Sequence, residues 1–229
     1  MADNPKHYGF KWQRSLSGAE TPQTEVYPIA SAYAPNTTFG GGGTSVNLNI
    51  GDPVRFGENG TLVLVEAGAA VADGSDTDKY TYGIVSGFPR VNINGVPRPS
   101  TYFPTGTTHA GLGADDCTLC SIIPVSGNVF TVDTDSAGGS SLDTKAEFAA
   151  IVGGTGNFQF NVLTSGAGQP KANPTLDISD VTMASTEVNQ LRVIGLGPDS
   201  QDYSGAYVSL QVVFNLVQAL PGTGSELNE

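Results

Sequence analysis

The sequence predicts an all-β protein: a sandwich or barrel of short antiparallel strands, with an extended N-terminal arm and one short helix. Between Tyr80 and Asp135, apolar and β-branched residues alternate with polar ones, and turn residues interrupt the alternation at short intervals. The 229 residues include 30 glycines and 14 prolines, which suit a fold made of many turns. Only 14% of the residues are charged, so Ser, Thr, Asn and Gly supply much of the polar surface.

The first 45 residues differ from the rest because they show no sustained periodicity. They contain four prolines and end in four consecutive glycines, Gly40 to Gly43. This composition predicts an extended arm with a short strand at residues 26–34 and a flexible joint at the glycines. The arm is rich in aromatic residues, so we expect it to dock on its own body or on a neighbouring subunit. The body is then residues 46–220, and 221–229 is a C-terminal tail.

The strands of the body follow from the same alternation. The clearest is residues 207–216, where five apolar side chains fall on one face. Hairpins are predicted at residues 58–60 and 126–127, and a turn is predicted at residues 94–95. A short helix is predicted at residues 143–152, with Asp143 as its N-cap. The remaining strands are expected at residues 46–50, 54–56, 62–65, 80–84, 91–93, 119–125, 128–132, 157–163 and 191–195.

Charge is unevenly distributed along the chain. The net charge is −12, while residues 1–14 carry Lys6, Lys11 and Arg14 against Asp3, a balance of +2 that leaves −14 for the rest. An acidic body argues against nucleic-acid binding, which needs clustered cations to displace counterions. No apolar run is long enough to span a membrane, and residues 1–30 lack the apolar core of a secretory signal.

Two short sequence patterns resemble metal or redox sites. Cys117 and Cys120 have CxxC spacing, but they lead into a predicted strand, whereas a redox CxxC needs a helix N-terminus. A structural zinc site needs four ligands, and the sequence has no second CxxC and only two histidines, His7 and His109. The loop that contains Asp73, Asp76 and Asp78 lacks the glutamate that closes an EF-hand, which favours a solvated turn over a calcium site. The sequence therefore predicts no metal site.

Catalytic motifs are missing as well. Ser86 is followed by glycine but lacks the first glycine of a nucleophile elbow. The glycines 40–43 are not followed by the Lys and Ser or Thr of a phosphate-binding loop. Nothing selects a catalytic pair from the 22 acidic residues. We therefore predict that the protein is not an enzyme and uses no cofactor.

An ordered series of short segments covers most of residues 7–217. The segments are His7-Tyr8-Gly9-Phe10-Lys11, Ser17-Gly18, Tyr27-Pro28-Ile29-Ala30-Ser31, Gly51-Asp52-Pro53-Val54, Gly83-Ile84-Val85-Ser86-Gly87, Asn94-Gly95, Tyr102-Phe103-Pro104-Thr105-Gly106-Thr107, Val129-Phe130-Thr131-Val132, Leu191-Arg192-Val193-Ile194-Gly195-Leu196 and Val213-Phe214-Asn215. In this order they resemble head decoration or minor capsid proteins of tailed bacteriophages, especially short-tailed ones. Residues 117–120 depart from the pattern, where the family leads us to expect an acidic or alanine-rich strand.

The resemblance implies a structural virion protein that binds the assembled capsid and stabilises it. Its partners would be the major capsid protein and further copies of itself, with a trimer favoured. It would lie on the outer capsid surface after synthesis in the cytoplasm of a host bacterium. Two alternatives remain: a component of the tail or of a head fibre, and a carbohydrate-binding β-sandwich that could also be a hydrolase.

The basic, aromatic start of the chain is the expected contact surface. Large aromatic side chains supply contact area at low entropic cost, and this stretch of the chain is net-positive. The residues expected to touch the capsid or an adjacent subunit are Lys6, Tyr8, Phe10, Lys11, Trp12 and Arg14.

Overall fold

A computed structural model describes residues 9–29, 48–57, 60–68, 77–93, 96–103, 118–135, 142–163, 171–183, 189–198, 203 and 207–218. The predicted class is confirmed: these residues form antiparallel sheets with one short α-helix. In the described part of the chain, no helix combines the length and the apolar character needed to cross a bilayer.

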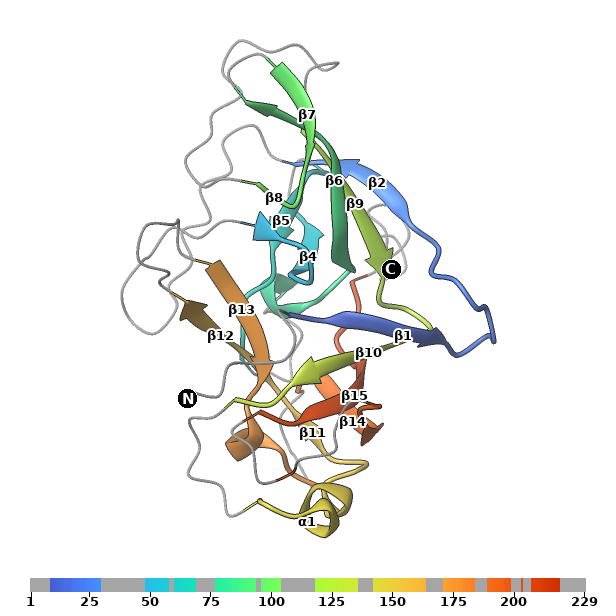
Figure 1. Ribbon diagram of the computed structural model, residues 1–229, viewed down its shortest axis with the longest axis vertical. Coiled ribbons are helices and arrows are strands. Elements are labelled where there is room, and N and C mark those ends of the chain that lie inside the picture. Colours follow the sequence, from blue (N-terminus) through green and yellow to red (C-terminus); the bar gives the residue numbers. More distant parts are fainter. Residues whose placement is uncertain are drawn as a thin grey trace, which may run out of the picture.

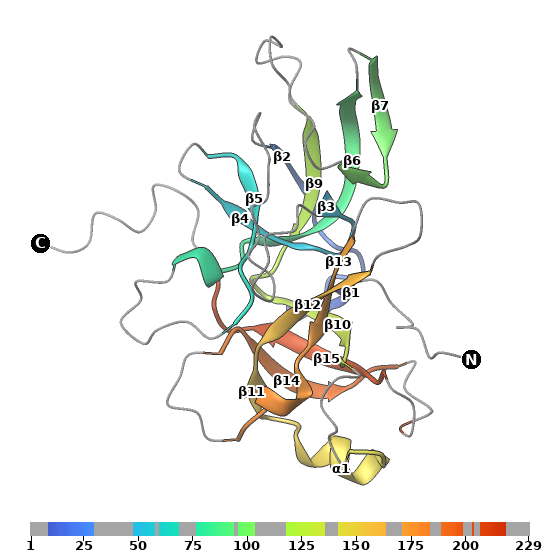
Figure 2. The same ribbon diagram turned by 90° about the vertical axis from the view of Figure 1, so that its left-hand side faces the viewer.

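A five-stranded sheet occupies the lower half of Figure 1. From one edge to the other, its strands are β1 (Lys11–Ser15), β10 (Asn128–Asp133), β15 (Ser209–Phe214), β14 (Leu191–Leu196) and β11 (Thr155–Gly156). All neighbours are antiparallel, and Phe130 of β10 is opposite Val212 of β15. The helix α1 (Lys145–Ala150) lies at the lower end of the molecule in both views (Figures 1 and 2).

A six-stranded sheet occupies the upper half. Its main order is β2 (Glu25–Pro28), β9 (Leu119–Pro124), β6 (Gly83–Ile93), β4 (Pro53–Phe56) and β5 (Leu62–Leu64). The sixth strand, β7 (Val96–Ser100), pairs with the outer part of the long β6, and the two project from the body in Figure 2.

Smaller elements complete the fold. Two two-stranded ribbons are formed by β12 (Phe158–Leu163) with β13 (Lys171–Leu176) and by β3 (Leu48–Asn49) with β8 (Tyr102–Phe103). In the described part of the chain, 3-10 helices cover Thr77–Lys79 and Ile178–Asp180.

Most of the buried apolar residues belong to two clusters, which we call the lower core and the upper core. The lower core is centred on the five-stranded sheet and contains Phe10, Val65, Ile84, Ile123, Val125, Phe130, Val132, Phe148, Phe158, Leu176, Ile178, Leu191, Val193, Val208, Leu210, Val212 and Phe214. The upper core contains Ile29, Leu48, Val54, Phe56, Leu62, Leu64, Tyr82, Val85, Phe88, Val91, Phe103, Cys120 and Ile122.

The strands β6 and β9 contribute to both cores. Ile84 and Ile123 belong to the lower core, whereas their chain neighbours Val85 and Ile122 belong to the upper core. Successive side chains of a strand point to opposite faces, so this part of the upper sheet has a core on each face. That arrangement explains why residues 119–125 form an almost continuous apolar run.

The strongest sequence prediction, the strand within residues 207–216, is confirmed as the central strand of the five-stranded sheet. Its alternating apolar side chains are all buried, from Val208 through Phe214 to Leu216. Phe214 makes ring contacts with Phe10 and Phe130, at centroid distances of 5.0 and 5.8 Å. Burial on the predicted face fixes the register of the strand.

The predicted helix is present, but its cap was wrongly assigned. Thr144, and not Asp143, is the N-cap: its side chain accepts a hydrogen bond from the backbone N–H of Glu147, whose carboxylate accepts the Thr144 N–H in return. This capping box places the first helical residue at Lys145. Phe148 is buried in the lower core, as its spacing predicts.

The prediction of a hairpin at residues 126–127 was wrong. The strands on either side of this turn do not pair with each other, because β9 joins the upper sheet and β10 the lower one. The Asn128 side chain holds the turn by donating hydrogen bonds to the carbonyls of Pro124 and Ser126. By contrast, β4 pairs with β5 and β6 with β7 across the other two predicted turns, whose residues 58–59 and 94–95 lie outside the described part.

The described part of the N-terminal arm, residues 9–29, belongs to the sheets of the body. β1 is an edge strand of the lower sheet and β2 an edge strand of the upper sheet. Of the two docking partners expected for this segment, its own body is the one it contacts here. Residues 30–47, with the glycine joint and the predicted boundary at residue 45, lie outside the described residues, as does the tail 221–229.

Candidate functional site

The six residues predicted to form a contact surface are placed differently by the structure. Lys6 and Tyr8 lie outside the described residues. Lys11 and Arg14 are exposed on β1, and Trp12 is half-buried against the lower core. Phe10 was expected to face a partner. Its side chain is only 4% exposed and instead belongs to the lower core of its own chain.

Phe10 is held by both halves of the molecule. Its ring packs against Phe158 and Phe214 of the lower core, with centroid distances of 5.7 and 5.0 Å. Its backbone N–H donates to the carbonyl of Gly51, in the turn between β3 and β4 of the upper half, at 2.9 Å. Gly9 allows this approach, because its φ is +78° and a Cβ there would lie 2.6 Å from the Gly51 oxygen.

The rest of β1 is fixed by side-chain hydrogen bonds to β10. The Trp12 indole N–H donates to Asn128 Oδ1 at 2.9 Å, and Gln13 Nε2 donates to Thr131 Oγ1 at 3.1 Å. The exposed cations Lys11 and Arg14 lie on an edge strand, where charged side chains discourage unwanted strand pairing. They also keep positive charge on the surface of an otherwise acidic protein.

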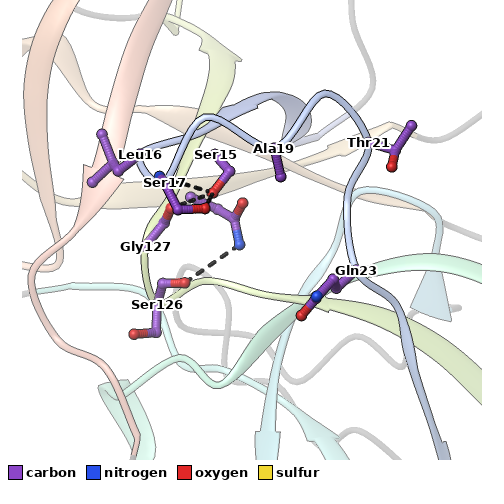
Figure 3. Close-up of a pocket in the computed structure, with 9 residues that line it drawn as sticks. Ser15, Leu16, Ser17, Ala19, Thr21, Gln23, Ser126 and Gly127 are labelled. Carbon is purple, nitrogen blue, oxygen red and sulfur yellow. Dashed lines mark hydrogen bonds between the residues drawn. The ribbon is translucent and has the colours of Figure 1, made fainter.

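A polar groove lies beside the end of β1, where the chain crosses between the two sheets twice. Residues 16–24 connect β1 with β2, and residues 125–127 connect β9 with β10 (Figure 3). The two crossings are joined by a hydrogen bond from the Leu16 N–H to the Gly127 carbonyl, at 2.8 Å. The groove between them has a volume of about 470 Å³.

The described residues that line the groove are all uncharged. The first crossing contributes Ser15, Leu16, Ser17, Ala19, Thr21 and Gln23. The second crossing contributes Ser126, Gly127 and Asn128. The lining therefore offers hydroxyl, amide and backbone groups, together with Leu16, whose side chain is 60% exposed.

Only part of this polar lining is engaged in internal hydrogen bonds. Ser15 and Ser17 share a hydrogen bond between their hydroxyls at 2.8 Å, and Asn128 is committed to Trp12, Pro124 and Ser126. Among the described residues, none forms a hydrogen bond with the side chains of Thr21, Gln23 or Ser126, which are exposed. These three side chains are therefore able to bind water or a ligand.

Sequence reasoning missed this groove. The stretch 16–24 reads only as a polar loop with a glycine and a proline. Nothing in the sequence associates it with Ser126 and Asn128, more than a hundred residues away. The wrong hairpin prediction at residues 126–127 also concealed that the chain changes sheets at that point.

The CxxC pattern does not form a reactive site in the described part. Cys120 is fully buried in the upper core, and Cys117 lies outside the described residues. Burial raises the pKa of the Cys120 thiol, and the negative charge of Asp52 raises it further. A thiol held in its protonated form is a poor nucleophile and a poor metal ligand.

The other predicted candidates are dispersed or lie outside the described residues. Asp78 forms an ion pair with Arg55, while Asp73 and Asp76 are not described. Ser86 donates a hydrogen bond to Ser121 across the upper sheet at 3.0 Å, and both histidines lie outside the described part. Among the residues that are described, no group of three His, Cys, Asp or Glu side chains could hold a metal ion.

One polar cluster in the upper half was not anticipated. The hydroxyls of Tyr27 and Tyr82 both donate to Glu25 Oε2, each at 2.7 Å. The two tyrosine rings also pack edge-on at a centroid distance of 5.9 Å. The cluster connects the edge strand β2 with Tyr82, the residue that precedes β6. Its role is therefore explained by the structure of the fold.

Comparison of the chain with models of protein families, with curated protein sequences and with solved structures gave no match.

Proposed function

We propose that this chain is a structural virion protein, a decoration or cement protein that binds the outer surface of an assembled bacteriophage head and stabilises it. The main support for the proposal is the position in the fold of the segments that resemble such proteins. Most of the described ones coincide with strands or with the turns that join them, so the resemblance involves residues that determine this fold.

Individual segments illustrate this correspondence. Phe10 enters the lower core immediately before β1, and Gly51-Asp52 forms the turn before β4. Val129-Phe130-Thr131-Val132 lies within β10, and Leu191 to Leu196 is the whole of β14. A resemblance of this kind supports a shared architecture, and the function of the family is carried over by analogy.

The physical requirements of such a role are compatible with the molecule. A protein that binds only the assembled shell stabilises that shell by mass action, without any catalytic step. Many equivalent copies multiply weak contacts into tight overall attachment. The exposed cations Lys11 and Arg14 provide a positive edge that is suited to an acidic patch on the major capsid protein. A symmetric homo-oligomer, with a trimer favoured, belongs to the same proposal.

The proposal is tested by locating the chain in virions. An antibody against the purified protein, coupled to gold, is applied to virions of the phage that encodes the chain. Labelling over the head supports the proposal, while labelling confined to the tail identifies a tail component instead. Virions that contain no copies of the chain, by mass spectrometry, overturn the structural assignment altogether.

The contact surface is tested separately, with purified heads that lack the protein. The double charge reversal Lys11→Glu with Arg14→Glu should weaken co-sedimentation with these heads. The matched control reverses Lys145 and Arg192, a lysine and an arginine that are equally exposed but lie on α1 and β14. Equal binding by the two variants would remove β1 from the contact surface.

A further inference from the structure

The polar groove between residues 15–23 and 126–128 is a feature that the capsid role does not require. Both of its walls are chain crossings between the two sheets, and they are joined by the Leu16 to Gly127 hydrogen bond. β1 and β10 anchor the two walls on the same edge of the lower sheet, since Arg14 pairs with Val129 and Ser15 with Asn128. Paired strands and a backbone hydrogen bond therefore hold both walls of the groove in place.

From the chemistry of its lining, we infer that this groove binds a neutral carbohydrate, an oligosaccharide of hexose or N-acetylhexosamine units. Its volume of about 470 Å³ is within the usual range for small-ligand sites. Thr21, Gln23 and Ser126 line the groove, and their exposed hydroxyl and amide side chains have no hydrogen-bond partner among the described residues. Hydroxyls and amides both donate and accept hydrogen bonds, and so do the hydroxyls of a sugar.

The absence of charge in the lining determines the class of ligand. None of the nine lining residues is charged, although the chain as a whole carries a net charge of −12. A phosphate, sulfate or uronate ligand would be expected to meet arginine or lysine in its site, because charge-assisted hydrogen bonds are the strong ones. Arg14 and Glu20, the charged chain neighbours of this region, are not among the lining residues. A neutral polyhydroxyl ligand needs no such partner.

Trp12, the only tryptophan of the sequence, lies beside the groove but is not one of its lining residues. In the structure it lies on the edge strand β1, half-buried, and its indole N–H donates to Asn128 of the groove lining. The exposed Leu16 adds an apolar surface on which the C–H face of a sugar ring can lie.

The single tryptophan also supplies a direct probe. In ¹⁵N-labelled protein, the indole region of an NMR correlation spectrum will contain one signal, that of Trp12. Four neutral oligosaccharides are titrated to millimolar concentration: maltotriose, cellotriose, mannotriose and triacetylchitotriose. At least one should shift the Trp12 indole signal in a saturable manner, together with backbone signals of residues 15–23 and 126–128.

Variants then separate the groove from the rest of the surface. Replacing Thr21, Gln23 and Ser126 together by alanine removes the uncommitted groups and should weaken binding at least about tenfold. All three side chains are exposed, so the variant is expected to fold, which is checked by an unchanged spectrum away from the groove. The matched control is Thr101→Ala, an exposed threonine in the upper half that should leave the affinity unchanged.

Several results would overturn the inference. The first is that none of the four oligosaccharides shifts the Trp12 signal. The second is that trigalacturonic acid or inorganic phosphate shifts it as strongly as the neutral sugars do. The third is that the signal moves with protein concentration alone, which would make the groove a contact between copies of the chain. Each outcome is independent of whether the protein is found in virions.

Discussion

The two cores of this protein are built from different chemistry. Buried phenylalanine and aliphatic side chains make up the lower core, and β15 runs through the centre of its sheet. The upper core is similar in its aliphatic residues but also includes Tyr82 and Cys120, and the buried carboxyl of Asp52 lies in the turn before β4. Carboxyls are buried in the lower half as well, at Asp133 and Asp135, and Asp135 accepts hydrogen bonds from Gln159 and from the backbone N–H of Ile178. At Asp52 burial raises the pKa, so protonation of this acid affects the stability of the upper half.

The N-terminal segment connects the two halves and has a larger structural role than its composition indicates. Residues 9–29 form an edge strand of each sheet, and Phe10 is bound to both halves at once. The segment thus joins the half that contains the lower core to the half that contains Asp52.

The largest effect should come from the lower core. Phe214→Ala removes a ring that contacts Phe10 and Phe130, and it should lower the free energy of unfolding by about 3–5 kcal/mol. Cys120→Ala in the upper core removes a much smaller group and should cost about 1 kcal/mol. Urea unfolding monitored by circular dichroism measures both. A Phe214→Ala protein that melts within a degree or two of the parent would show that this part of the lower core is not well packed.

Asp52 in the upper half should make the stability of the protein depend on pH. Asp52 is 1% exposed, and burial raises its pKa well above the ordinary value, although the backbone N–H of Asn49 partly opposes this. A raised folded-state pKa means that the folded protein binds the proton more tightly than the unfolded chain. This contribution to stability is complete below the unfolded pKa of about 3.9 and is lost as pH rises through the folded pKa.

Asp52→Asn should therefore raise the melting temperature at pH 7 and leave it almost unchanged at pH 3. The asparagine oxygen can still accept the Asn49 N–H, so the turn is retained. Asp177→Asn, a change in a carboxyl that caps a 3-10 helix in the lower half, serves as the control. A melting temperature that falls at pH 7 in Asp52→Asn would mean that the ionised carboxylate stabilises the turn.

A smaller effect is expected at the joint between the halves. Gly9→Ala places a Cβ 2.6 Å from the Gly51 oxygen in a backbone with positive φ, and we expect a loss of about 1–3 kcal/mol. Gly18→Ala has the same kind of backbone but nothing within 4 Å of the new Cβ. Thermal unfolding of the two variants separates steric contact from backbone strain. Equal losses would show that Gly9 does not need to approach the turn closely.

The smallest effect concerns the cap of α1. Thr144→Ala removes the N-cap hydroxyl and should cost about 0.5–2 kcal/mol, while Asp143→Ala should cost less. Glu147 completes the capping box, and hydrogen bonds from Asp143 and Thr144 lower its pKa. The comparison is made by chemical unfolding at pH 7. A larger loss in Asp143→Ala would restore the assignment made from the sequence.

The alternating strands could be predicted from the sequence because one period dominates them. β15 and β14 alternate between buried and less buried faces, and β4 with β5 is marked by its turn residues. The sequence failed where proline or polar residues interrupt that period. β7 contains two prolines and β13 contains one, a residue that is tolerated in sheets mainly on edge strands.

Long-range pairing was the second limit of sequence reasoning. No local signal shows that β9 and β10 belong to different sheets, because a short turn between two strands usually makes a hairpin. The same holds for β1, whose polar and charged residues give no alternation, but whose neighbour Phe10 reaches the lower core. The groove depends on both features, so it could not be predicted from the chain order alone.

Residues 9–29 are built into both sheets. Hydrogen exchange of the backbone amides in this segment tests that claim most directly. The intact protein is transferred to deuterated buffer at pH 7, and exchange is followed by mass spectrometry of peptides from this segment. The structure predicts that hydrogen-bonded amides in β1 and β2 are protected like those of other edge strands, while those of residues 17–24 exchange rapidly. Unprotected exchange across the whole of residues 9–29 would contradict the account and identify a free arm.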